Sequence, residues 1–239
     1  MPIYRMANLN IDIQNRYEHV ARQCKDYLAT TAATPDLSVS VSEEEIDAAL
    51  ALQPQFSRGY HESICIYRRL CTALLHHGRF MVHAAVIKYD GYAYAFSAKS
   101  GTGKSTHISL WRKYFGEGVT IINGDKPILE QVEGGFVAHG TPWCGKEGWN
   151  RNDSAPLKAI CFLERSTENY IRRLTAREAV ERIFHQLLRP KTAAEMDLTV
   201  SLADALLRTV PVYVLGCDIS REAAELSFRT LTATNKEEL

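Results

Sequence analysis

The stretch that decides the fold runs Ala98-Lys99-Ser100-Gly101-Thr102-Gly103-Lys104-Ser105 and is followed by Thr106 and His107. It has the form A-x-x-x-x-G-K-S, with alanine where the first glycine of a phosphate-binding loop usually stands. Glycines allow the backbone to fold around an anion, so that N–H groups point toward phosphate oxygens. A helix that begins at Lys104 adds the positive end of its dipole. We therefore predict that residues 98–106 bind phosphate, with Lys104 at the β- and γ-phosphates and the Ser105 hydroxyl on Mg²⁺. The alternative is a glycine-rich turn that caps an ordinary helix.

The composition is that of an ordinary globular protein. The 239 residues are 46% apolar and 23% charged, which suits one large domain or one domain with a smaller N-terminal part. Lys+Arg and Asp+Glu balance at 28 each, so no overall field favours nucleic acid or an anionic membrane as a partner. The six cysteines show no C-x-x-C pairing and are expected to be reduced. No apolar run is long enough to cross a membrane and no secretion signal is visible, so we expect a cytoplasmic protein.

Two apolar runs lead into the phosphate loop. Residues 80–89 and 92–97 are separated by Asp90-Gly91, the signal for a two-residue type I′ hairpin. Counting outward from this turn gives three pairs: Tyr89 with Tyr92, Val86 with Ala95, and His83 with Ala98. The register predicts that the strand before the loop has an antiparallel neighbour and that His83 lies at the entrance of the loop. Without the register, a hydrogen-bonded strand histidine would be the simpler interpretation.

A second candidate for phosphate chemistry follows the helix of the loop. The apolar run 119–122 ends in Asn123-Gly124-Asp125-Lys126-Pro127. A carboxylate at the end of a buried strand can hold Mg²⁺ or accept a proton, which makes Asp125 a candidate for both roles. The same pattern also occurs in simple turns, and the preceding phosphate loop is what favours the metal-binding interpretation.

The remaining patterns predict an α/β protein with a mixed-sheet core and a small α+β N-terminal region. Strands are expected at 3–13, 38–42, 128–132, 135–139, 156–164, 169–174 and 211–215. Helices are expected at 15–28, from the Ser42 capping box to Pro54, and at 60–76. Further helices are expected at 107–115, after the Thr175 capping box, at 201–209 and at 220–231. We expect residues 1–77 to pack on a core formed by residues 78–239.

The long connection 140–154 carries three glycines and two tryptophans, which favours an ordered loop that faces a substrate. Trp143 and Trp149 could equally belong to the core. Lys146 and Arg151 could neutralise transition-state charge, although an exposed position is the commoner fate of such residues. His107 is likewise expected on a helix surface rather than as a catalytic base.

Taken together, four features resemble the superfamily of HPr kinase/phosphorylase and ATP-dependent phosphoenolpyruvate carboxykinase. They are His83, the Asp90-Gly91 hairpin, residues 100–105 and the strand that ends at Asp125. The loop is similar to the carboxykinase form, and the histidine before the hairpin is similar to that of HPr serine kinase. Four short motifs are similar to small stand-alone HPr-kinase-like proteins of bacteria: Leu110-Trp111, 125–127, 140–143 and 156–160. Some of those proteins accompany peptide-modification systems and phosphorylate serine. The resemblance covers residues 78–232.

The resemblance implies a P-loop core of the carboxykinase/HPr kinase type that uses ATP and Mg²⁺. It assigns catalytic assistance to His83, nucleotide binding to residues 98–106, and metal binding or general-base catalysis to Asp125. The chain departs from both families at Gly124, where the first of two adjacent aspartates would stand. Asp125 then acts alone, or Asn123 or a substrate group fills the position. This departure argues against the reverse phosphorylase reaction, and the substrate-binding residues of the carboxykinases have no clear counterpart.

We therefore expect a kinase that transfers phosphate from ATP to a hydroxyl, of serine type, in a protein, a peptide or a small molecule. The main alternative function is a regulator that binds ATP without transferring phosphate, and a third possibility is a kinase of a small metabolite. Gly124 favours the regulator, whereas His83 and Asp125 favour the kinase. We expect no nucleic-acid or membrane partner. The sequence is compatible with a homo-oligomer.

Overall fold

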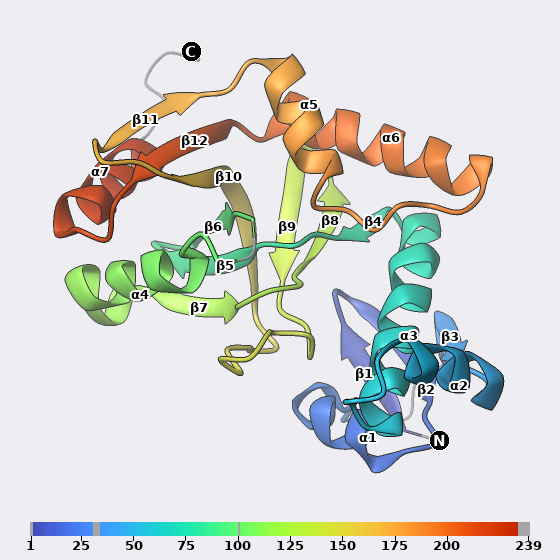
Figure 1. Ribbon diagram of the computed structural model, residues 1–239. Coiled ribbons are helices and arrows are strands. Elements are labelled where there is room, and N and C mark those ends of the chain that lie inside the picture. Colours follow the sequence, from blue (N-terminus) through green and yellow to red (C-terminus); the bar gives the residue numbers. More distant parts are fainter. Residues whose placement is uncertain (1, 31–33, 100, 234–239) are drawn as a thin grey trace.

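The structure is a computed structural model that describes residues 2–30, 34–99 and 101–233. In this part of the chain the strands form a small N-terminal sheet and a larger curled sheet, both flanked by helices (Figure 1). The N-terminal sheet has the order β1-β2-β3, with β1 antiparallel to β2 and β3 parallel to it. Its strands are β1 (Ile3–Met6), β2 (Leu9–Gln14) and β3 (Leu37–Ser40).

Three helices pack on the small sheet: α1 (Glu18–Gln23), α2 (Glu43–Leu52) and α3 (Arg58–Ala73). Two short 3-10 helices follow α1 and α3: η1 (Lys25–Tyr27) and η2 (Leu74–His77). Ser42 forms the predicted capping box with Glu45 at the start of α2. The sheet and the helices share one apolar cluster, which also takes in Met81, Ile128 and Trp143 from the rest of the chain. The N-terminal part therefore packs directly on the larger sheet.

The larger sheet has the order β4-β8-β9-β10-β6-β5-β7, with β12 paired to β10 and β11 to β12. Its first strands are β4 (Arg79–Met81), β5 (Ala85–Tyr89), β6 (Tyr92–Ser97) and β7 (Thr120–Asn123). The others are β8 (Ile128–Val132), β9 (Gly135–His139), β10 (Ser154–Arg165), β11 (Tyr170–Arg173) and β12 (Val212–Cys217). β10 is parallel to β6 and β12 but antiparallel to β9, so the sheet is mixed, as the sequence predicts.

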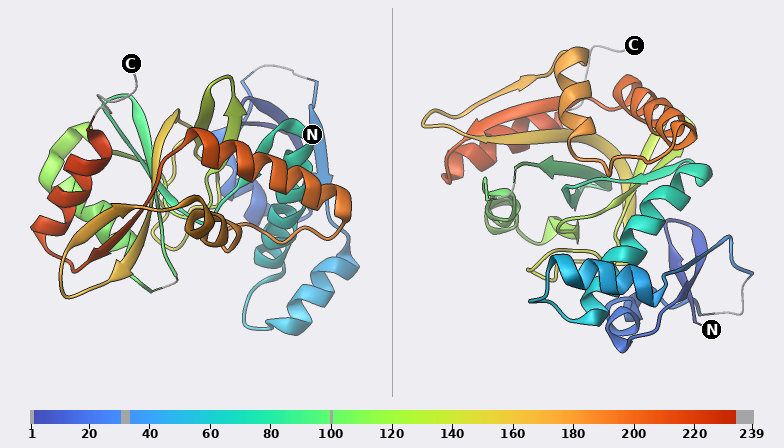
Figure 2. Two further views of the ribbon diagram at one scale, coloured as in Figure 1. Left: turned by 90° about the horizontal axis from the view of Figure 1, so that it is seen from above. Right: turned by 45° about the vertical axis from the view of Figure 1, so that its right-hand side comes forward.

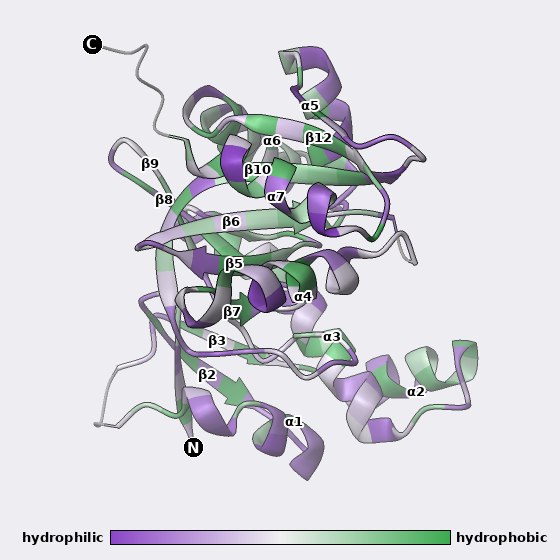
Figure 3. Cartoon of the chain, turned by 90° about the vertical axis from the view of Figure 1, so that its left-hand side faces the viewer, coloured by the Kyte–Doolittle hydropathy of each residue, from purple (hydrophilic) through white to green (hydrophobic). Residues whose placement is uncertain are grey.

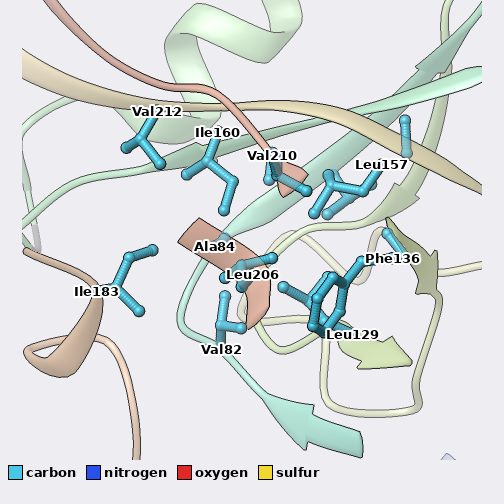
Figure 4. Packing of buried hydrophobic residues seen from close by; sticks show 14 of the residues in the cluster. Val82, Ala84, Leu129, Phe136, Leu157, Ile160, Ile183, Leu206, Val210 and Val212 are labelled. Carbon is cyan, nitrogen blue, oxygen red and sulfur yellow. The ribbon is translucent and has the colours of Figure 1, made fainter. Parts of the chain in front are cut away.

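Helices cover both faces of this sheet (Figure 2). α4 (Lys104–Phe115) and α7 (Arg221–Thr232) lie on one face, whereas α5 (Ala176–Phe184) and α6 (Ala193–Thr209) lie on the other. The alternation of side chains along β6 explains the two layers. Tyr94 and Phe96 pack toward α4, and Ala93 and Ala95 belong to the opposite cluster. Figure 4 shows the packing within that opposite cluster, which includes Ile160, Ile183 and Leu206.

Several boundaries differ from the predicted ones. The run 80–89 is divided, because Arg79–Met81 pairs with β8 whereas Ala85–Tyr89 pairs with β6. The helix expected at 201–209 begins already at Ala193, because Thr192 and Glu195 form a capping box at its start. All six cysteines are free thiols, as expected. Among the described helices, none has the length and apolar character needed to span a membrane.

Candidate functional site

The glycine-rich loop connects β6 to the start of α4. β6 is buried along most of its length, and Ala98, which follows it, is 4% exposed. Gly101 and Gly103 adopt φ values of +77° and +119°, a region that other residues rarely occupy. α4 begins at Lys104, as predicted, so the N–H groups of its first turn have no partner within the helix. This is the local geometry that suits an anion. Ser100 lies outside the described residues.

The turn after β7 is built by a buried asparagine. The Asn123 Oδ1 atom accepts hydrogen bonds from the backbone N–H groups of Asp125, at 2.8 Å, and Lys126, at 2.7 Å. Its Nδ2 atom donates to the carbonyl oxygen of Thr141 at 2.9 Å. The Asn123 side chain is fully buried and fully used in this way, so it does not fill the place of a second metal ligand. That sequence-based alternative is wrong. The function of Asn123 is to fix the Asp125 turn.

Three cationic or potentially cationic side chains converge on Asp125. Its Oδ1 atom lies 3.1 Å from His83 Nε2 and 3.1 Å from Lys104 Nζ, and its Oδ2 atom lies 3.7 Å from Lys126 Nζ. Asp125 and His83 are each more than a quarter exposed, whereas the side chain of Lys104 is 12% exposed. The structure therefore brings together His83, Lys104 and Asp125, which the sequence analysis selected as site residues.

His83 reaches this position by a route that differs from the predicted one. The register counted from the hairpin turn holds for Tyr89 with Tyr92 and for Val86 with Ala95, but the ladder ends at Ala85. His83 lies just outside the ladder, where its carbonyl oxygen accepts a hydrogen bond from Ser97 Oγ at 2.8 Å. The neighbouring N–H of Ala84 donates to the carbonyl oxygen of Asp125 at 3.0 Å. This backbone contact places the imidazole beside the carboxylate.

The ionisation of the site follows from these contacts. Burial alone would raise the pKa of Asp125, but the hydrogen bond from His83 and the charges of Lys126 and Lys104 outweigh it and hold this pKa well below its usual range. Burial lowers the pKa of Lys104, while Asp125 acts in the opposite direction. Asp125 is therefore anionic at any physiological pH, a state that suits a charge partner better than a strong base.

Position 124 has no room for a side chain. A Cβ atom on Gly124 would lie 2.7 Å from the carbonyl oxygen of Cys144. The connection after β9 also binds this position directly, because the N–H of Gly124 donates to the carbonyl oxygen of Trp149 at 2.8 Å. The packing of residues 140–154 against Gly124 therefore leaves no space for an aspartate side chain at this position.

The connection brings a further acidic residue that the sequence analysis did not single out. A Cβ atom on Gly145 would lie 3.2 Å from Asp125 Cβ and 3.6 Å from Glu147 Oε2, so the two acidic side chains flank the same small space. Glu147 also acts to raise the pKa of Lys104. The residues next to Glu147 in the sequence do not indicate this position, because it depends on how the connection folds back over β7.

Other residues of the connection have structural positions. Trp143 is 6% exposed, and its Nε1 atom donates to Ser63 Oγ at 3.0 Å in the N-terminal cluster. Trp149 is half-buried against the cluster below α4. Lys146 and Arg151 are exposed, which is the commoner position that we expected for such residues. Trp143 is thus a core residue rather than part of a substrate-facing loop.

His107 contradicts the expectation of a helix-surface residue. It is 2% exposed, and its Nε2 atom lies 3.0 Å from Ser227 Oγ on α7. Burial lowers the pKa of His107 to about 4. The reason is the packing of α7 across α4, which the local sequence does not reveal.

The fold and the site define a mixed α/β protein in which a glycine-rich loop, a helix N-terminus and a carboxylate at a strand end meet at one place. Residues 62–225 match the family model described as SynChlorMet cassette protein ScmC, and the chain belongs to this family. A search of curated proteins found no match. Among solved structures, the chain is similar to the Hpr(Ser) kinase/phosphatase from Coxiella burnetii, at 9% identity and a TM-score of 0.36. That similarity covers 63% of this chain and 95% of the other.

Proposed function

We propose that the protein is an ATP- and Mg²⁺-dependent kinase that phosphorylates a hydroxyl of serine type. The observation that carries the proposal is the convergence of Lys104 and His83 on Asp125 at the N-terminus of the loop helix, with both contacts at 3.1 Å. Phosphoryl transfer depends mainly on charge neutralisation and alignment, and this cluster supplies both. Asp125 contacts Lys104 Nζ, and a bound triphosphate would compete for the same ammonium group.

The donor set fits a magnesium ion. Asp125 offers a carboxylate that its neighbours keep ionised, and Ser105 follows Lys104 in the first turn of α4 with a hydroxyl oxygen. Both are oxygen donors of the kind Mg²⁺ prefers. When bound, the ion would neutralise charge on the phosphate oxygens. Glu147 adds a second carboxylate beside Asp125, on the other side of Gly145.

The His83–Asp125 pair provides a group that can accept the proton of the acceptor hydroxyl. His83 Nε2 donates to Asp125, and no hydrogen bond found among the described residues uses His83 Nδ1. Asp125 thereby orients the imidazole so that Nδ1 can accept a proton. The acceptor oxygen forms a bond to the γ-phosphorus while the bond to the β–γ bridging oxygen breaks. ADP leaves with that electron pair, and the hydroxyl proton passes to His83.

A second candidate is a regulator that binds ATP and transfers nothing. The observation that favours it is Gly124, because the end of β7 carries one carboxylate and has no space for another. The two candidates differ in a single measurable property, which is the transfer of the γ-phosphate.

The test is incubation of the protein with γ-labelled ATP, Mg²⁺ and three kinds of acceptor: serine-containing peptides, a protein extract and free serine. If the protein is a kinase, at least one of these acceptors becomes labelled. Lys104→Ala then abolishes both the labelling of the acceptor and the binding of ATP. Arg112→Ala, an exposed substitution on the same helix, serves as the control and leaves both unchanged. Tight ATP binding that requires Lys104, with no label on any acceptor, would refute the kinase and support the regulator.

A further inference from the structure

A groove of about 830 Å³ lies beside the N-terminal sheet. Its lining comes from β3, α2, α3, η2, the connection between α5 and α6, and the first turn of α6. Figure 1 shows α2, α3 and β3 grouped together, with the connection from α5 to α6 passing over the end of α3. None of the lining residues belongs to the site at the phosphate loop, so the groove requires an explanation of its own.

One wall of the groove is the edge of a sheet. β3 pairs with β2 on one side, and within residues 2–30, 34–99 and 101–233 no strand pairs with its other side. Ser38, Val39 and Ser40 of β3 line the groove. Backbone N–H and C=O groups along an unpaired edge lack partners within the sheet and form a template for an added strand. The groove therefore offers main-chain hydrogen bonds to an extended ligand.

The facing wall offers apolar contacts. Ala48, Ala49 and Leu52 of α2 line the groove, and Leu52 is 82% exposed. Leu188 contributes from the α5–α6 connection, where it is 38% exposed. Figure 3 shows α2 standing away from the rest of the molecule with hydrophobic residues along it. Large apolar side chains exposed along one groove are typical of binding surfaces.

The two acidic residues that line the groove serve local structure. Glu45 closes the capping box of α2 with Ser42 and pairs with Arg69 at 2.7 Å. Glu195 accepts hydrogen bonds from the backbone N–H groups of Lys191, at 2.9 Å, and Thr192, at 3.3 Å. Neither carboxylate forms a side-chain ion pair with the other cations of the lining.

The remaining charge of the groove is positive. Arg68, Arg189 and Lys191 line it, and in the described part of the chain no carboxylate lies within salt-bridge distance of any of them. All three are exposed. The whole chain carries 28 basic and 28 acidic residues, so this excess is local rather than a property of the composition. A ligand that fits the groove electrostatically is acidic.

We propose that the groove binds an extended acidic peptide segment of a partner protein, which adds a strand to the free edge of β3. Successive side chains of such a strand point to opposite faces. Apolar residues of the peptide enter between α2 and the α5–α6 connection, while acidic residues contact Arg68, Arg189 and Lys191. Main-chain hydrogen bonds provide affinity, and the side-chain pockets and charges provide selectivity. The proposal does not depend on the activity of the phosphate loop.

The first test measures binding of a fluorescein-labelled twelve-residue peptide in which leucine and glutamate alternate. The full-length protein binds this probe, binding weakens as salt is added, and the same peptide with lysine for glutamate does not bind. The double variant Arg68→Glu/Arg189→Glu weakens binding about tenfold or more. The control is Lys25→Glu, beside the opposite edge of the same sheet, where Leu28 forms a bridge to Tyr4; it leaves binding unchanged.

The second test addresses the backbone. N-methylation of one alternating set of peptide residues removes the donors that face β3 and abolishes binding, whereas methylation of the other set does not. Hydrogen exchange at residues 37–40 slows when the unmodified probe is added. Three results would overturn the proposal: no binding at millimolar concentration, equal binding of both methylated peptides, or a dimer of the chain that occupies this edge and excludes the probe.

Discussion

At the scale of single residues, Asp125 determines what the site can do. Its carboxylate is the common partner of His83, Lys104 and Lys126, and these partners hold its pKa well below the usual range. An anion of this kind balances the charge of the loop lysine, orients the imidazole and suits a metal ion. It accepts a proton poorly near neutral pH, which is why we assign the proton transfer to His83.

Replacing Asp125 separates binding from turnover. Asp125→Asn keeps the shape of the side chain and removes its charge, so the loop still presents Lys104 to the triphosphate. We expect ATP affinity within a few-fold of wild type and a turnover about 10²–10⁴-fold lower. The comparison uses calorimetric ATP titration and label transfer. Asp153→Asn, whose carboxylate pairs with Lys88 at 3.0 Å elsewhere, is the control and keeps full turnover. Loss of ATP binding in Asp125→Asn would instead make Asp125 a structural anchor.

His107 makes stability depend on pH. Burial lowers its pKa to about 4 from the ordinary 6.5, so the unfolded chain takes up a proton between these values while the folded chain does not. The free energy of unfolding therefore decreases as the pH falls from 6.5 toward 4, by on the order of 3 kcal/mol. Denaturant titrations of His107→Gln should lose this part of the pH dependence, whereas His76→Gln, at an exposed position, should keep it. An unchanged slope in His107→Gln would contradict the assignment.

At the scale of elements, the connection after β9 shapes the site by crossing the end of β7. It closes the space above Gly124, where a Cβ atom would lie 2.7 Å from the carbonyl oxygen of Cys144. It also carries Glu147 to the neighbourhood of Asp125. The missing second aspartate and the additional glutamate thus have one structural cause.

Gly124→Asp therefore does not restore a pair of aspartates at the end of β7. We expect the new side chain to displace the connection and to lower the free energy of unfolding by about 1–3 kcal/mol, with reduced label transfer. Gly135→Asp is the matched control, because a Cβ atom there meets nothing within 4 Å. A Gly124→Asp protein that is more active and equally stable would contradict this expectation, because it would show that the connection moves aside without cost.

Local signals in the sequence predicted the loop and the hairpin but not their surroundings. Asp90-Gly91 defined the pairing of β5 with β6, and the glycines and lysine of the loop defined the start of α4. These features depend on backbone preferences of a few adjacent residues. The burial of His107 depends on Ser227, which lies 120 positions away along the chain. Hydrophobic periodicity does not say which helix packs on which, so such contacts could not be predicted.

At the scale of the whole molecule, Trp143 joins the N-terminal part to the larger sheet. It belongs to the N-terminal apolar cluster and donates a hydrogen bond to Ser63 on α3, although it follows β9 in the chain. We propose that the boundary between the two parts lies near residue 77, where η2 ends. The tryptophan then sits where the two parts meet.

Removing this side chain should weaken the whole fold. Trp143→Ala leaves a cavity and removes the hydrogen bond from the indole to the Ser63 hydroxyl, and we expect the free energy of unfolding to decrease by about 3–5 kcal/mol. Ile219→Ala, at a side chain that is 76% exposed, should change it little. Urea titration followed by circular dichroism measures both. A small effect in Trp143→Ala would mean that the two parts are held together elsewhere.

A crystal structure of the protein with Mg²⁺ and a non-hydrolysable ATP analogue would show directly whether the phosphate loop, His83 and Asp125 act on one nucleotide. We expect the triphosphate to lie on residues 98–106, Lys104 Nζ to contact the terminal phosphates instead of Asp125, and His83 to face the γ-phosphate. A nucleotide bound elsewhere, or a γ-phosphate out of reach of both His83 and Asp125, would contradict it.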